Sequence, residues 1–161
     1  PHVFGDVKAD STEKVLENWD KIKMEEKHQQ SYTDTLDAVP KAFPALMRAQ
    51  KVQKRAAKAN FDWSDINEPL LKVGEELDEL EEAIEGGCKG HIFEYFGDLL
   101  FAAVNVSRFL KIDSEQALSA ATDKFIDRFE KVEKLCNERG IDMSKSDLET
   151  LDEIWDEVKK L

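Results

Sequence analysis

The sequence has few of the residues that interrupt or cross-link secondary structure. Its 161 residues include only 7 Gly, 4 Pro and 2 Cys. The two cysteines, Cys88 and Cys136, are too few for a disulfide scaffold, and no spacing of Cys and His resembles a zinc site. This cysteine usage favours a reducing compartment, and the scarcity of Gly and Pro favours helices.

Long apolar runs and an excess of positive charge are also missing. No apolar run reaches the roughly 18 residues that a membrane-spanning helix needs, and the chain shows no charged-then-apolar leader. The net charge of −12 argues against a nucleic-acid polymer as partner, because that interaction depends on Lys and Arg neutralising phosphates. We therefore expect a cytoplasmic protein with neither a membrane nor a nucleic-acid polymer as partner.

The sequence is rich in charged residues, at 36%, and in apolar residues that recur with the period of a helix. This pattern predicts an all-α helical bundle. We expect an N-terminal helix and linker over residues 1–40 and one main domain over residues 41–161. Within them the pattern predicts helices over 10–27, 44–60, 67–85, 91–110 and 113–139, a last helix capped by Ser146 and Glu149, and a turn-rich connection over 29–39.

The two central helices carry the candidate chemistry. Residues 91–110 have apolar side chains in almost every direction, as expected for a helix that is buried on most sides. At roughly 100° per residue, His91, Glu94, Asp98 and Asn105 fall within about 60° of arc. An ionised carboxylate such as Asp98 in a buried helix must be paired or bound to a metal.

The preceding acidic helix supplies further carboxylates. Glu76 and Glu79 lie on the shoulder of its apolar stripe, and antiparallel packing across the Gly86–Gly90 connection turns them toward Glu94 and Asp98. Such a group of carboxylates repels itself unless a hard cation is present, and ligation by oxygen alone suits Mg²⁺, with Mn²⁺ as a possible substitute. The alternative, that this acidic run is a solvated helix face, stays open.

Several segments together resemble the MazG family of all-α nucleoside triphosphate pyrophosphohydrolases. Residues 72–79 and 97–101 are similar to its signature, which pairs Glu-x-x-Glu on one helix with Glu-x-x-Asp on the next. The segments 44–51 and 61–63, Lys124-Phe125 with Arg128-Phe129, and Ile154-Trp155 with Lys159 resemble the second domain of the tandem form. Residues 1–4 resemble the segment joining its two domains, which implies a further domain before Pro1.

The resemblance implies a bundle completed by dimerisation and Mg²⁺-dependent hydrolysis of nucleoside or deoxynucleoside triphosphates to monophosphate and pyrophosphate. The implied catalytic residues are Glu75, Glu76, Glu79 and Asp98, and the implied metal ligands are Glu76, Glu79, Glu94 and Asp98. The implied substrate-binding residues are Lys72, His91, Glu94, Lys124, Arg128, Trp155 and Lys159. Lys124 and Arg128 are one turn apart, and a Lys with an Arg fork suits phosphate oxygens.

Three positions depart from the family pattern. Tyr95 occupies the first acidic position of Glu-x-x-Asp, Thr122 occupies the place of an Asn, and His91 stands where a related enzyme has Lys. These departures support a second hypothesis, a nucleotide-binding and dimerisation module with weakened catalysis. A third is a dimerisation domain whose carboxylates are solvated.

Two further patterns have more than one interpretation. Residues 41–58 hold six basic and no acidic residues, and Arg48, Lys51, Arg55 and Lys58 share a helix face. These cations either pair with acidic helices of the same bundle or approach a bound triphosphate. The pair formed by Trp155 and Lys159 is either a docking tail or a cover for the nucleotide.

Overall fold

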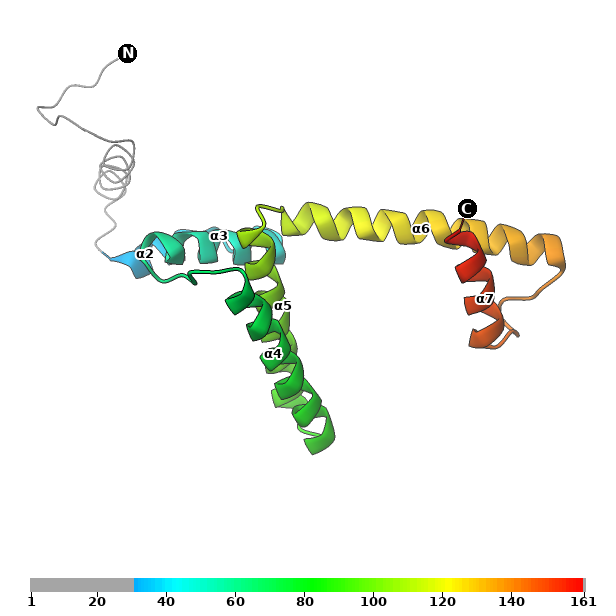
Figure 1. The fold of residues 1–161 in the computed structure, drawn as a ribbon, viewed down its shortest axis with the longest axis horizontal. Coiled ribbons are helices and arrows are strands. Elements are labelled where there is room, and N and C mark those ends of the chain that lie inside the picture. The colour runs from blue at the N-terminus through cyan, green and yellow to red at the C-terminus, as the bar shows by residue number, and fades with distance from the viewer. Residues whose placement is uncertain (1–30, 161) are drawn as a thin grey trace, which may run out of the picture. The chain divides into compact units, whose positions relative to one another are not determined.

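The computed structural model describes residues 31–160, and every regular element among them is a helix (Figure 1). The all-α prediction is therefore confirmed for this part of the chain, while the helix predicted over 10–27 lies outside it. The helices are α2 (Tyr32–Asp37), α3 (Ala45–Lys58), α4 (Asn67–Gly86), α5 (Lys89–Phe109), α6 (Ser114–Arg139) and α7 (Leu148–Val158). The chain divides into two compact units after Leu110, and each unit is described by itself.

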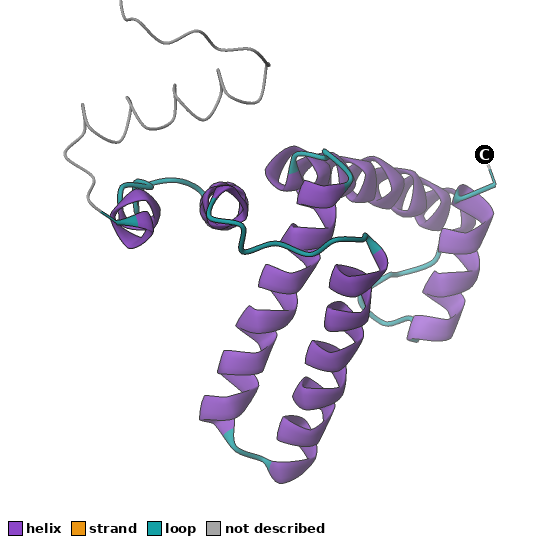
Figure 2. Cartoon of the chain, turned by 60° about the vertical axis from the view of Figure 1, so that its left-hand side comes forward, coloured by secondary structure: helices purple, strands orange, loops and turns teal. Residues whose placement is uncertain are grey.

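The first unit is built around the α4–α5 hairpin, whose helices run antiparallel beside each other (Figure 2). Gly87 ends α4 in the left-handed region at φ 67°, and its N–H donates to the Ile84 carbonyl at 3.1 Å. Glycine adopts this conformation without a Cβ penalty. Cys88 then precedes the first residue of α5 in an extended conformation. Antiparallel pairing is as predicted, and the connection shortens to Gly87 and Cys88.

Two shorter helices complete this unit. Helix α3 packs against α5, and the Gln53 Nε2 donates to the Phe101 carbonyl at 2.8 Å. Helix α2 packs on α3 and lies within the segment predicted as a turn-rich connection, so that prediction is wrong. The reason is a capping box in which Ser31 Oγ accepts the Asp34 N–H at 3.1 Å and Asp34 accepts the Ser31 N–H at 2.8 Å. Such reciprocal bonds start a helix even in a polar sequence.

The second unit is the pair α6–α7, and it has a closed apolar core. Val132 and Cys136 of α6 meet Ile154 and Val158 of α7, and none of the four is more than 3% exposed. The spacing of these residues follows the helical period in both helices, so each helix presents one apolar stripe to the other. The core is formed where the C-terminal part of α6 faces α7.

The ends of α6 and α7 are set by specific caps. Asp113 accepts the Gln116 N–H at 2.9 Å at the start of α6, and Gly140 follows that helix at φ 67°, which agrees with the predicted range 113–139. Helix α7 is capped by Asp147, which accepts the Thr150 N–H at 2.8 Å, and not by Ser146. The prediction missed the cap by one residue because an Asp at this position competes equally well for the N-terminal N–H groups.

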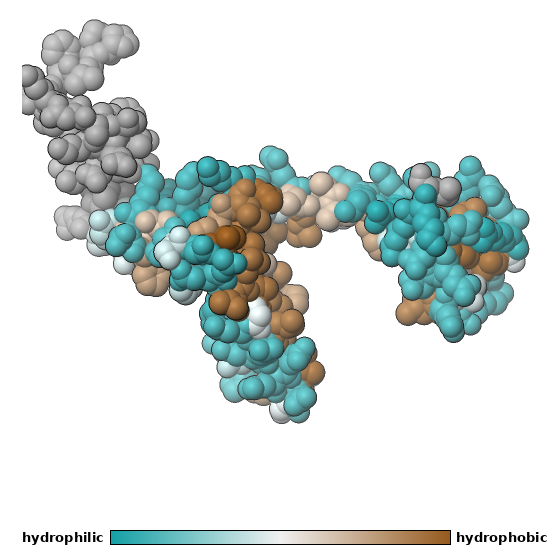
Figure 3. All heavy atoms as spheres, in the orientation of Figure 1, coloured by the Kyte–Doolittle hydropathy of each residue, from teal (hydrophilic) through white to brown (hydrophobic). Residues whose placement is uncertain are grey.

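The predicted burial of the 91–110 helix on most sides is wrong for the single chain. Only Ala102 and Val104 of α5 are buried, whereas Phe93 is 85% exposed and Phe96 is 53% exposed. Figure 3 shows apolar side chains, in brown, at the surface of the hairpin. The cause is that α5 contacts α3 and α4 on two sides only. No described helix is both long and apolar enough to cross a membrane.

Candidate active site

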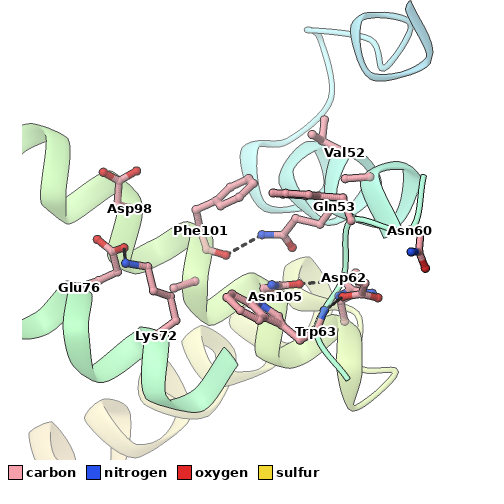
Figure 4. Close-up of a pocket in the computed structure, with 14 residues that line it drawn as sticks. Val52, Gln53, Asn60, Asp62, Trp63, Lys72, Glu76, Asp98, Phe101 and Asn105 are labelled. Carbon is pink, nitrogen blue, oxygen red and sulfur yellow. Dashed lines mark hydrogen bonds and ion pairs between the residues drawn. The ribbon is translucent and has the colours of Figure 1, made fainter. Parts of the chain in front are cut away.

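A pocket of about 430 Å³ lies in the first unit, between α3, α4, α5 and the turn at residues 60–63 (Figure 4). One face of α5 forms its floor, because the residues that α5 contributes recur at steps of three and four. These residues are Asp98, Phe101, Ala102, Asn105 and Arg108. At 1.5 Å rise per residue, the floor extends for about 15 Å along the helix. The pocket therefore has two ends, which differ in chemistry.

One end of the pocket holds two carboxylates, Glu76 of α4 and Asp98 of α5 (Figure 4). The Glu76 side chain is buried, with 6% of the residue exposed, while Asp98 is exposed. One Glu76 oxygen contacts Lys72 Nζ at 2.7 Å, and the other, Oε2, is buried without a hydrogen-bond partner. Buried carboxylate oxygens are normally paired or bound to a metal, so Oε2 is an open position for a cation.

Lys72 partly compensates this negative charge. Its Nζ lies 2.7 Å from Glu76 Oε1 and 3.2 Å from Glu75 Oε2. The hydrogen bonds to Glu76 and then to Glu75 raise the pKa of Lys72 well above its ordinary value. The Lys72 side chain is 38% exposed, and solvent weakens such a pair. Lys72 is therefore a permanent cation beside the carboxylates and remains accessible to an anionic ligand.

The structure brings together some of the predicted metal ligands and not others. Among the described residues, no three His, Cys, Asp or Glu side chains are grouped closely enough to form a metal centre. Among the predicted metal ligands, Glu79 is half-buried and Glu94 is exposed, and neither of them lines the pocket. The carboxylate predicted to be buried, Asp98, is exposed, and Glu76 is the buried one. Helix α5 is covered on two sides only, so Asp98 faces an open part of the pocket.

The chemistry of these donors fits Mg²⁺. This ion commonly takes one or two carboxylates and completes its shell with waters and substrate phosphates. Glu76 supplies an unpartnered buried oxygen, and Asp98 supplies a second carboxylate in the same pocket. Ligation by Glu79 and Glu94 stays a prediction.

The other end of the pocket is aromatic and amide-rich. Phe61 and Trp63 come from the turn, Phe101 and Asn105 from α5, and Gln53 from α3 (Figure 4). The sequence pattern points to Asn105 and to the turn that holds Phe61 and Trp63, but not to Gln53 or Arg108. Arg108 continues the polar strip of Asp98 and Asn105 by one more turn, and that spacing could have revealed it.

The remaining predicted site residues lie elsewhere. His91 is exposed, and its ring centroid is 6.2 Å from that of Tyr95. Thr122, Lys124, Arg128, Trp155 and Lys159 all belong to the second unit. There the Trp155 ring centroid lies 5.1 Å from that of Phe125, and Lys159 Nζ donates to Asp156 at 2.8 Å. The roles of these residues in substrate binding stay predictions.

Two basic residues of α3 make contacts within the α2–α3 region. Arg55 donates to the Thr35 carbonyl of α2, and Lys51 Nζ lies 5.5 Å from the centre of the Phe43 ring. Among the described residues that line the pocket, none belongs to the set of Arg48, Lys51, Arg55 and Lys58. For Arg55 and Lys51 the structure therefore shows a third use, contacts within the α2–α3 region.

Comparisons with known proteins show which sequences this chain resembles. Residues 67–133, which include α4 and α5, match the MazG nucleotide pyrophosphohydrolase domain. The chain is 44% identical over 164 residues to the nucleoside triphosphate pyrophosphohydrolase of Escherichia coli K12. It is 40% identical over 159 residues to the nucleoside triphosphate pyrophosphohydrolase/pyrophosphatase MazG of Thermotoga maritima. An uncharacterized protein of Bacillus subtilis, YabN, is 45% identical over 161 residues.

These alignments cover 99% of the chain in each case. The chain in turn spans 62% of the Escherichia coli protein, 59% of the Thermotoga maritima protein and 33% of the Bacillus subtilis protein. The similarity therefore applies to the part of each relative that this chain matches.

Proposed function

We propose that this chain, whose residues 67–133 match the MazG nucleotide pyrophosphohydrolase domain, is a member of that family and hydrolyses nucleoside or deoxynucleoside triphosphates to the monophosphate and pyrophosphate. We propose further that the reaction depends on Mg²⁺, with Mn²⁺ as a possible substitute. The observation that carries this proposal is the buried, unpartnered Oε2 of Glu76 in the same pocket as Asp98 and Lys72.

The two ends of the pocket suit the two ends of a nucleotide. Glu76, Asp98 and Lys72 offer a site for a cation and for phosphate oxygens, while Phe61, Trp63 and Phe101 offer apolar surface for a base. A triphosphate without a base would leave these aromatic groups unused, and a flat aromatic ligand without phosphates would leave the carboxylates unmatched. A nucleoside triphosphate satisfies both ends.

In this mechanism Glu76 and Asp98 would hold the metal ion, and Glu79 and Glu94 are further candidates for its shell. Mg²⁺, when bound, would supply charge neutralisation on the phosphates and a water of lowered pKa. Glu75, which is exposed beside Glu76, or Glu94 would orient the attacking water. Lys72, as a cation beside these carboxylates, would stabilise the negative charge that develops on the phosphates.

Substrate-binding roles are also proposed for residues that do not line the pocket. Lys124 and Arg128 would bind phosphate oxygens, Trp155 and Lys159 would cover the nucleotide, and His91 of the first unit would be a further contact. We propose a homodimer as the working form, since the exposed apolar side chains of α5 offer an interface. The two free cysteines favour a cytoplasmic location.

The alternative is a module that binds nucleotides but hydrolyses them weakly. It is based on Tyr95 and Thr122, which lack the carboxylate and amide of the family pattern. In the structure Thr122 Oγ1 donates to the Leu118 carbonyl at 2.9 Å, within its own helix. Two relatives are named as nucleoside triphosphate pyrophosphohydrolases, which favours hydrolysis.

The test is release of pyrophosphate from each nucleoside and deoxynucleoside triphosphate, with and without Mg²⁺. We expect turnover that needs the metal and is abolished by Asp98→Asn without loss of helical circular dichroism. Asp78→Asn, which changes an exposed carboxylate of α4 outside the pocket, is the matched control and keeps the wild-type rate. Wild-type turnover by Asp98→Asn would contradict the metal assignment, and metal-dependent binding without turnover would favour the alternative.

A further inference from the structure

Arg108 makes a two-pronged contact with Asp62 at the aromatic end of the pocket. Its Nη1 donates to Asp62 Oδ2 at 2.9 Å, and its Nη2 donates to Asp62 Oδ1. A third guanidinium nitrogen, Nε, donates to Asn105 Oδ1 at 2.8 Å. The two charged side chains are only 14% and 29% exposed. A planar guanidinium that meets a carboxylate with two parallel bonds fixes both position and orientation.

This contact joins α5 to a turn that has little burial of its own. Phe61 is 82% exposed and Trp63 is 42% exposed, so apolar packing contributes little to their placement. The Asp62 carboxylate also accepts the Trp63 N–H at 2.9 Å. The two-pronged contact with Arg108 therefore fixes the Asp62 carboxylate. Asp62 in turn fixes the backbone of the turn that carries the exposed Phe61 and Trp63 side chains.

Arg108 is too far from the carboxylate end to act on the phosphates directly. It lies ten residues after Asp98 on the same helix, and ten residues correspond to about 15 Å. Its three polar contacts are already directed at Asp62 and Asn105. Any effect of Arg108 on substrate therefore acts through the wall formed by the turn.

We propose that Arg108 is a positioning residue for the substrate's base. Through Asp62 it fixes the turn at residues 60–63 as the wall against which the base packs, opposite Phe101. This inference rests on the proposed function, and it assigns the aromatic end of the pocket to a base and the carboxylate end to the triphosphate. Stacking of a base on an aromatic side chain changes affinity by roughly 5- to 100-fold, which sets the scale of the expected effect.

The experiment compares two ligands that differ only in the base. These are the α,β-methylene analogues of adenosine triphosphate and of ribose 5-triphosphate, which resist cleavage, and their dissociation constants are measured by calorimetry with Mg²⁺. We expect wild type to bind the adenosine analogue more tightly. Arg108→Lys keeps the positive charge but loses the two-pronged contact with Asp62. We therefore expect the ratio of the two dissociation constants to fall by about 10-fold. Binding of the ribose analogue stays within about twofold, because this ligand makes no contact with the wall.

Two further variants separate positioning from general stability. Asp62→Asn removes the carboxylate charge that Arg108 contacts, and we expect it to lower the preference for the adenosine analogue as well. Arg139→Lys is the matched control, since Arg139 makes a similar two-pronged contact with Glu157, at 2.7 and 2.8 Å, in the second unit. We expect it to leave the preference unchanged. Because the preference is a ratio measured on one preparation, a partly unfolded sample does not alter it.

Two outcomes overturn the proposal, and a third separates it from the proposed hydrolysis. If wild type binds both analogues equally or binds neither, the pocket has no base subsite. If Arg108→Lys weakens both analogues by the same factor, Arg108 has only a structural role. If the preference falls as expected but wild type releases no pyrophosphate from any nucleotide, the positioning role stands and the proposed hydrolysis fails.

Discussion

The α6–α7 pair and the α4–α5 hairpin bury different kinds of residue. In α6–α7 the buried set is apolar, with Val132, Cys136, Ile154 and Val158 covering one another. In α4–α5 the buried set includes the charged Glu76, while large apolar side chains such as Phe93 remain exposed. A stable core requires the first arrangement. The second indicates a region shaped by binding, where local rules of burial are broken for a ligand or a partner.

The same contrast appears in the polar contacts of the two regions. The Arg139 and Glu157 side chains in α6–α7 pair with each other and are both more than 40% exposed. In α4–α5 the Glu76 side chain is only 9% exposed and is incompletely satisfied, since its Oε2 has no partner. Unpaired buried oxygens cost free energy unless a ligand satisfies them. The hairpin therefore carries a buried polar atom that needs an outside partner, and the described side chains of α6–α7 include no such atom.

The largest expected effect concerns the buried carboxylate. Glu76→Gln keeps the shape of the side chain but removes the charge that holds a cation, so we expect pyrophosphate release to fall by at least about 100-fold. Glu82→Gln, on an exposed position of the same helix, is the control and retains activity. Steady-state rates with Mg²⁺ measure both. Equal loss in the two variants would mean that charge of the acidic helix in general, and not this site, supports turnover.

The next effect concerns the closed core. Ile154→Ala removes a side chain that is 3% exposed, and we expect a loss of about 2–5 kcal/mol in the free energy of unfolding. Leu148→Ala on the same helix removes a side chain that is 81% exposed, and we expect a change within about 0.5 kcal/mol. Denaturant unfolding followed by circular dichroism compares them. A similar cost for both would show that Leu148 is covered by a partner. Burial within the single chain would then not explain the difference between buried and exposed positions.

A smaller effect is expected on the exposed face of the hairpin. Phe93→Ser removes apolar surface that the single chain leaves open, so it should change the stability of the monomer by no more than about 0.5 kcal/mol. If the face is a dimer interface, the same change should weaken association by about 10- to 100-fold. Sedimentation at micromolar concentration measures this, against a monomer of 18.4 kDa. A wild-type protein that sediments as a monomer throughout would rule out the dimer.

The smallest effect concerns Tyr95. A phenol is neutral near pH 7, so Tyr95→Glu restores a carboxylate at the acidic position of the family pattern. We expect turnover to rise several-fold, about 3- to 10-fold, or the Mg²⁺ requirement to fall by a similar factor. Titration of the rate with Mg²⁺ and Mn²⁺ detects either change. If Tyr95→Glu has no effect and Glu94→Gln is inactive, Glu94 already provides that ligand.

Much of the fold follows from the sequence because its signals are local. The period of the apolar residues placed α3 to α7 to within a few residues, and Gly140 marked the end of α6. The helix α2 was missed because its start depends on two polar side chains, Ser31 and Asp34, which also suit a turn. Local signals therefore predict helices well and predict short capped turns poorly.

The site was predictable only in part because it depends on contacts between distant residues. The signature identified Glu76 and Asp98, which line one pocket. It did not show which of the two is buried, since that depends on how many helices cover α5. The contact between Asp62 and Arg108 joins residues 46 apart, and no periodic pattern reports a contact of that kind.

The most direct test of the central claim is to identify the products of the wild-type reaction by phosphorus NMR. A nucleoside triphosphate is incubated with the protein and Mg²⁺ until turnover is complete, and a parallel sample contains a chelator. The account predicts equal amounts of nucleoside monophosphate and pyrophosphate, and no reaction with the chelator. Nucleoside diphosphate with orthophosphate, or products that form equally well without the metal, would contradict it.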